Sequence, residues 1–232
     1  MSDVFEFFDH PAQPPLQTQL HLAVQEALTE FPTVRLLHRV RTNTLLLAHY
    51  HQLLAALYHV VHLTPHCYAR AAINCGALHG SVQSYLEQRA SAARDHSQLI
   101  LNDLANTRYA GPDIRALSPP VFAQPLIGLL SFVAHEAPLC TLAIICVLDA
   151  INFTHRSCFH RMQHTLNLSG AATRYLSAAS SLASEQRCAV WAAIAGVQPS
   201  DDVQKRMTQA AESTGRFYCR LFDGCEPMLE QE

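Results

Sequence analysis

Residues 85–104 read YLEQRASAARDHSQLILNDL, and this stretch decides the fold. From His96 onward, Leu99, Ile100 and Leu104 follow at helical spacing and form one apolar face. His96 lies one turn before Ile100, beside that face, and Asp103 follows near the end of the stretch. A helix with an imidazole beside its apolar face can carry chemistry inside a helical bundle.

The composition around this stretch favours helices throughout. The chain has 232 residues, of which 49% are hydrophobic, so it is long enough for one sizeable core. It contains only 8 glycines, and its apolar runs are rich in alanine and leucine rather than in alternating β-branched residues. We therefore expect an all-α protein, with residues 1–15 as an irregular N-terminal arm and residues 16–232 as a single helical domain.

The distribution of charge argues against nucleic-acid and membrane partners, and cysteine usage indicates the cellular compartment. Lys205 is the only lysine and the arginines form no basic block, which argues against binding to nucleic acid or to a membrane surface. The longest apolar run, residues 138–148, is too short to span a bilayer and ends at Asp149. The 8 cysteines form no CxxC pair, and the N-terminus lacks the pattern of a secretory signal. The sequence thus predicts a cytoplasmic protein with free thiols.

Apolar periodicity and helix-stop residues predict about seven principal helices. Pro65 is expected to kink or break the second of them, and Pro138 to begin the fifth. The predicted helices cover residues 16–30, 45–75, 85–104, 125–135, 138–162, 171–194 and 203–222, with a short helical piece near Leu37.

Three phrases together resemble a known superfamily. They are HYHQLLAALYHVVHLTPHCYARAA (49–72), DHSQLILNDL (95–104) and PLIGLLSFVAHEAPLCTLAIICVLDA (125–150). In this order they are similar to the haem-oxygenase-like superfamily, and within it to the branch of non-haem di-iron oxidases and oxygenases. The resemblance covers residues 31–194. It implies a bundle of about seven helices with a buried active site, and dioxygen activation on a small organic substrate.

The resemblance also implies an iron site, whose ligands must be found one at a time. His96 matches the histidine of the family's "GHD" phrase, and Asp149 stands where the family has a glutamate. Glu87 is a more distant candidate for the carboxylate before the histidine, and Glu26 is the candidate from the first helix, with Glu30 as its alternative. Carboxylates and imidazoles that converge from different helices are the donors that hold such iron.

Several of the family's ligand positions hold residues that cannot bind iron. Ala92 and Ala93 occupy the places of an acidic pair before His96. Ala179, Ala183 and Gln186 occupy the places of a histidine, an aspartate and a second histidine, and a register shift offers only Glu185. The metal site is therefore expected to be degenerate.

Three functions follow from these matches and losses. The first is an iron-dependent oxidase or oxygenase that uses Glu26, Glu87, His96 and Asp149, helped by His155, His160 or His164. The second is a metal-free relative that binds a small ligand or a protein partner, or catalyses without metal as the cofactor-free oxidase of quinone biosynthesis in this superfamily does. The third is haem binding with His21 as axial ligand. For each of these functions we consider a homodimer as the oligomeric state. Carboxylates converging on His96 would favour the first, and an apolar cavity near Ala179 and Ala183 the second.

Overall fold

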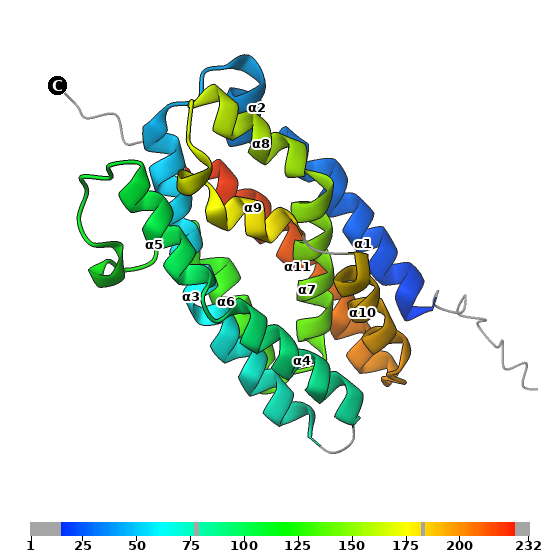
Figure 1. Cartoon of the computed structure of the whole chain (residues 1–232). Helices are drawn as coiled ribbons and strands as arrows, with labels where there is room; N and C mark the ends of the chain where they lie inside the picture. Colours follow the sequence, from blue (N-terminus) through cyan, green and yellow to red (C-terminus); the bar gives the residue numbers. More distant parts are fainter. Residues whose placement is uncertain (1–14, 77–78, 182–183, 226–232) are drawn as a thin grey trace, which may run out of the picture.

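The structure is a computed structural model that describes residues 15–76, 79–181 and 184–225, with the side chains of residues 184–187 left out of the description. The described residues form α-helices and short 3-10 helices without any strand (Figure 1). The α-helices are α1 (Leu16–Glu30), α2 (Arg35–Thr42), α3 (Leu47–Cys75), α4 (Gly80–Ala93), α5 (His96–Asn106), α6 (Gln124–Glu136), α7 (Cys140–Thr154), α8 (Arg156–Thr165), α9 (Arg174–Ser180), α10 (Ser184–Ala195) and α11 (Asp201–Asp223).

The all-α prediction is confirmed, but several predicted helices are divided in the structure. Residues 85–104 break between α4 and α5, where Asp95 leaves helical geometry. Residues 138–162 bend by 52° between α7 and α8. Residues 171–194 contain a 3-10 turn, then α9 and α10. The predicted arm lies almost wholly outside the described residues, so the division of the chain at residue 16 stays a prediction.

Pro65 does not break the second long helix. It lies inside α3, which continues to Cys75. Proline removes one backbone donor and costs about 3 kcal/mol in a helix interior. The hydroxyl of the preceding Thr64 donates to the Val60 carbonyl at 2.8 Å, and both flanks of α3 bury apolar side chains. Tertiary burial therefore outweighs the local cost of the proline.

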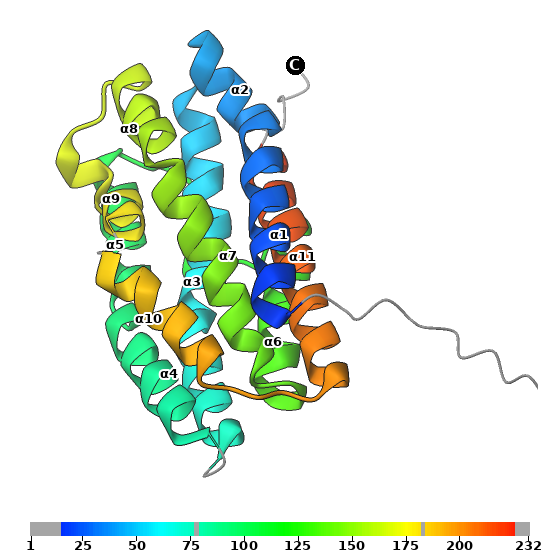
Figure 2. The ribbon, with the colours of Figure 1, turned by 90° about the vertical axis from the view of Figure 1, so that its right-hand side faces the viewer.

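α7 is the central helix. Every residue from Cys140 to Val147 is buried, and a helix that is apolar all round belongs in a core. Figure 2 shows α3 and α7 in the middle, with α4, α5, α9 and α10 on one side and α1 and α11 on the other. No described helix alone is long and apolar enough to cross a membrane, and only the bent pair of α7 and α8 meets that criterion, by length and composition alone.

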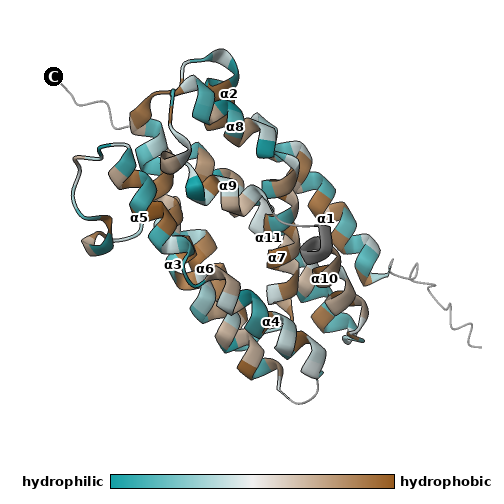
Figure 3. Ribbon diagram, in the orientation of Figure 1, coloured by the Kyte–Doolittle hydropathy of each residue, from teal (hydrophilic) through white to brown (hydrophobic). Residues whose placement is uncertain are grey.

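α1 and α11 approach each other closely on the side of α7 opposite α4, α5, α9 and α10 (Figure 2). Along α1, hydrophilic and hydrophobic residues alternate (Figure 3). The buried residues Leu16, Leu20 and Val24 follow at four-residue spacing and share one face. At the contact with α11, a Cβ added to Gly215 would lie 2.7 Å from the Cβ of Ala27. The absence of a side chain at Gly215 thus permits the close packing of these two helices.

We expect Gly215→Ala to lower the free energy of unfolding by about 1–3 kcal/mol, because the added methyl overpacks the contact with Ala27. Gly128→Ala is the matched control, since Gly128 is also helical but its added Cβ meets nothing within 4 Å. This control is expected to gain up to about 1 kcal/mol from the higher helix propensity of alanine. Urea unfolding of both variants measures the difference, and equal stabilities would contradict the close approach.

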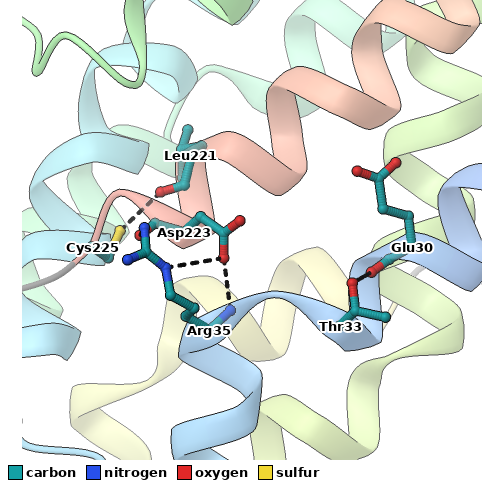
Figure 4. A network of polar contacts seen from close by, with 6 residues as sticks. All are labelled: Glu30, Thr33, Arg35, Leu221, Asp223 and Cys225. Atoms are coloured by element: carbon teal, nitrogen blue, oxygen red, sulfur yellow. Dashed lines mark hydrogen bonds and ion pairs between the residues drawn. The ribbon is translucent and has the colours of Figure 1, made fainter.

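The carboxyl end of α11 caps α2. The Asp223 carboxylate accepts the Arg35 backbone N–H at 2.7 Å, and the Arg35 guanidinium donates to the Asp223 carbonyl at 3.2 Å (Figure 4). Val34, the residue before α2, has no side chain that can cap a helix. Asp223 satisfies one of the free N–H groups at the start of α2 from a distant part of the chain.

Candidate functional site

A cavity of about 430 Å³ lies between α3, α4, α5, α7, α9 and α11. Its volume falls within the range of pockets that bind small organic molecules. One part of its lining is apolar and consists of Leu57, Val60, Val61, Ala92, Ala93, Leu148, Ala178 and Ala179. The other part can form hydrogen bonds and consists of Thr64, Tyr68, Arg89, His96, Asp149, Asn152, Tyr175, Ser181 and Tyr218.

An ion pair joins two helices in the polar wall of this pocket. The Arg89 Nη2 of α4 donates to the Asp149 Oδ1 of α7 at 2.8 Å, with the two side chains only 16% and 7% exposed. Burial lowers the pKa of Arg89, but the Asp149 carboxylate together with the phenols of Tyr68 and Tyr85 raises it overall, so the guanidinium stays charged. Such charge-assisted hydrogen bonds are strong and hold both side chains in place.

Tyr68 extends this pair from α3. Its phenol interacts electrostatically with the Arg89 side chain, and burial raises the pKa of Tyr68 to about 12. The phenol therefore keeps its proton at neutral pH and remains a hydrogen-bonding group. The three side chains connect α3, α4 and α7 across the pocket wall.

His96 is the first residue of α5 and also lines the pocket. Its ring lies edge-on to Tyr175 of α9, with 6.3 Å between the ring centroids. Burial, together with the nearby Arg89 charge, lowers the pKa of His96, while Asp95 opposes the shift. At neutral pH the imidazole is therefore uncharged and can accept a proton or a hydrogen bond.

Asn152 and Tyr218 form a second polar pair in the same wall. The Tyr218 hydroxyl of α11 donates to the Asn152 Oδ1 of α7 at 2.8 Å. Asn152 follows Asp149 by three residues, so both side chains lie on one face of α7. The end of α7 thus presents a carboxylate and an amide to the pocket.

Asp103 of α5 positions the pocket wall formed by α9. Its side chain is fully buried, and its two oxygens accept the backbone N–H groups of Arg174 at 3.0 Å and Tyr175 at 2.9 Å. The Tyr50 hydroxyl donates to the Ala172 carbonyl just before this helix at 2.7 Å. These bonds fix the start of α9 and hence the position of Tyr175 in the pocket.

The structure brings together two of the four predicted iron ligands. His96 and Asp149 both line the pocket. Glu87 is exposed and accepts a hydrogen bond from Gln83 at 2.9 Å, and Glu26 is exposed on α1; neither lines the pocket. The alternative Glu30 is also exposed.

Three of the alanines that the resemblance aligns with iron ligands line the pocket, namely Ala92, Ala93 and Ala179. Ala183 lies outside the described residues, as do the side chains of Glu185 and Gln186.

The four additional histidines considered as ligands lie elsewhere. His155 contacts the Leu28 carbonyl at 3.2 Å through its Nε2. That carbonyl has no helical donor because the residue four positions on is Pro32, so His155 replaces the missing N–H. The other three are exposed: His160 and His164 lie on α8, and His21 stacks on Trp191 with 4.1 Å between ring centroids. None of them lines the pocket.

The described residues do not fit an iron site. Within them, no group of three or more His, Cys, Asp or Glu side chains lies close enough to hold a metal ion. In the pocket, Asp149 lies 2.8 Å from a guanidinium, whose permanent positive charge would repel a divalent cation bound by this carboxylate. A metal ion in this pocket would need carboxylates that bind no other cation. Here the Asp149 carboxylate already binds the positively charged guanidinium of Arg89.

Several pocket residues were not predicted from the sequence. Arg89 lies three residues before Ala92 and four before Ala93, on the same helix face. This spacing could have identified Arg89 as a pocket residue. Asn152 could have been identified in the same way, because it lies one turn after Asp149. Tyr175 and Tyr218 had no such signal, because they come from distant helices that only the tertiary structure brings to the pocket.

No protein-family model and no curated protein matches the chain. Among solved structures, a domain of unknown function with a haem-oxygenase-like fold from Shewanella denitrificans OS217 matches with a TM-score of 0.79 and 18% identity, over 90% of each chain. A TenA homologue from Pseudomonas syringae pv. tomato DC3000 matches with a TM-score of 0.73 and 13% identity, over 91% of this chain and 93% of its own. The chain therefore has the haem-oxygenase-like fold.

Proposed function

We propose that the chain binds a small organic molecule in the pocket between α3, α4, α7 and α9, without a resident iron. The observation that carries this proposal is the Arg89–Asp149 ion pair, which occupies the carboxylate that iron would need. The remaining lining combines an apolar surface with a few fixed polar groups, as small-molecule sites do.

The neutral imidazole of His96 favours a second candidate, which is proton transfer on the bound molecule without metal. A general base works best when it is unprotonated at the working pH, and burial of His96 favours this state. The nearby guanidinium would stabilise negative charge that develops on the substrate. His96→Gln should then abolish turnover while leaving ligand affinity nearly unchanged.

An iron-dependent oxidase is the alternative that the sequence resemblance suggests. It is supported by His96 and Asp149, which line one pocket. It requires Asp149 to leave Arg89 and further ligands to reach the pocket. Glu26 and Glu87 do not provide them where they lie, because both are exposed outside it.

We expect Ala179→Phe to abolish binding of small molecules, because the added ring fills the pocket. Thermal unfolding with a library of aromatic fragments measures this. At a ligand concentration of about 100 Kd, binding should stabilise the wild type by about 2.7 kcal/mol and raise its Tm by roughly 5–10 °C. The matched control is Ala69→Phe, an exposed position on α3 that should keep the full shift. Fragments that stabilise both variants equally would place the binding site elsewhere.

A further inference from the structure

The end of α7 carries a hydrogen-bond donor that faces the pocket in a fixed orientation. The Asn152 amide oxygen accepts the Tyr218 hydroxyl at 2.8 Å, which assigns the other side of the amide to its NH₂ group. Tyr218 is buried, and burial keeps its pKa well above 10, so its hydroxyl stays protonated and continues to donate. Tyr218 thus fixes which atom Asn152 offers to a ligand.

No residue in the described part of the chain accepts a hydrogen bond from the Asn152 amide nitrogen. Asn152 is half-buried and lines the pocket. A partly buried donor gains free energy from an acceptor, and its burial without one is costly. This N–H group is therefore available to an acceptor atom inside the pocket.

Arg89 supplies further donors beside this amide. A guanidinium has five N–H groups. One of them donates to Asp149, and Tyr68 lies within electrostatic reach of the guanidinium, which leaves N–H groups for a ligand. Asp149 and Asn152 are one turn apart on α7, and the guanidinium bound to Asp149 lines the same pocket as the Asn152 amide.

We infer that Arg89 and Asn152 together recognise a hydrogen-bond-accepting oxygen of the ligand, either a carbonyl or a carboxylate. The rest of the ligand packs on the apolar lining at Val61, Leu148 and Ala179. This inference rests on the proposed small-molecule function and specifies the chemistry of its ligand. It also makes Tyr218 a positioning residue, because it acts through Asn152.

Three probes of similar size test this recognition, namely benzamide with a carbonyl oxygen, benzoate with a carboxylate, and benzylamine with an amine. Ligand-observed NMR titrations of the full chain would measure their Kd values. We expect benzamide or benzoate to bind at least about tenfold more tightly than benzylamine, since one lost hydrogen bond to a charged group changes affinity by about this factor. The order of benzamide and benzoate tells whether the preferred oxygen is a carbonyl or a carboxylate.

Asn152→Asp tests the role of the amide directly. It keeps the size of the side chain and its bond from Tyr218, but it replaces the NH₂ donor with an acceptor. We expect the affinity for the oxygen-bearing probes to fall at least about tenfold and that for benzylamine to rise. Asn106→Asp is the control, because Asn106 is exposed on α5, and its affinities should match the wild type.

Tyr218→Phe provides a second variant that keeps the ring. It should weaken binding of benzamide severalfold without reversing the preference, because the amide loses its fixed orientation. Thermal unfolding confirms that each variant is folded. Tightest binding of benzylamine to the wild type, or unchanged affinities in folded Asn152→Asp, would overturn the oxygen-recognition inference alone. Absence of binding by all three probes and by the wider fragment library would overturn the proposed function together with it.

Discussion

Arg89→Met is expected to lower the free energy of unfolding by about 3–5 kcal/mol, the cost of removing one partner from a buried ion pair. Asp149 is only 7% exposed in its side chain, so its charge depends on the guanidinium 2.8 Å away. Methionine keeps most of the volume of the arginine stem, so the loss reports the charge rather than a cavity. Urea unfolding at neutral pH measures it.

The double variant Arg89→Met/Asp149→Leu provides the matched control. When both charges are replaced by apolar side chains of similar volume, stability should return to near the wild-type value or exceed it. The two single variants together with the double variant give the coupling free energy of the pair. A single Arg89→Met variant as stable as the wild type would show that the ion pair is not formed in solution.

Asp103→Ala is expected to cost about 2–4 kcal/mol, because two backbone N–H groups at the start of α9 lose their common acceptor. The same change should weaken ligand binding, since α9 places Tyr175 in the pocket. Urea unfolding and fragment titrations measure the two effects. Asp113→Ala is the control, because Asp113 also accepts a backbone N–H but is exposed, and its variant should stay close to the wild type. Equal losses in the two variants would contradict the special role of Asp103.

The contribution of Asp103 should also depend on pH. Burial raises the pKa of Asp103, and the hydrogen bonds from Tyr175 and Arg174 only partly oppose this. The unfolded chain releases this proton near the usual value of about 3.9, whereas the folded chain retains it to higher pH. The stability of the wild type relative to Asp103→Asn should therefore be greatest below about pH 4 and decline as the pH rises through the raised pKa. A relative stability that increases over this range would contradict the direction of the shift.

The fold was predictable from the sequence because its signals are local. Apolar periodicity fixed the bounds of α1 to residues 16–30, and Pro138 marked the region where α7 begins. The phrases around His96 and Asp149 were enough to indicate the haem-oxygenase-like fold. The helix breaks near Asp95 and His155 were missed, because no proline or glycine marks them and only tertiary packing decides them.

The pocket was predictable only in part, because it depends on contacts between distant segments. His96 and Asp149 were identified through the resemblance, and both line the pocket. Glu26 was the candidate for the family's first-helix glutamate and Glu87 a more distant candidate for the carboxylate before His96, but helix phase places both at the surface. Arg89 was overlooked since a single arginine on a helix usually faces solvent, and only the contact with α7 shows its role.

Metal content and an anaerobic titration with ferrous iron test the central claim most directly. They would be made on the wild type, His96→Ala and Asp149→Ala, with His160→Ala as a control for exposed histidines. Because Arg89 holds Asp149, we predict no stoichiometric iron in the wild type and no difference among the four proteins. Stoichiometric iron in the wild type and in His160→Ala that is lost in His96→Ala and Asp149→Ala, with an absorbance change on adding dioxygen, would contradict the metal-free account and establish an iron oxygenase site.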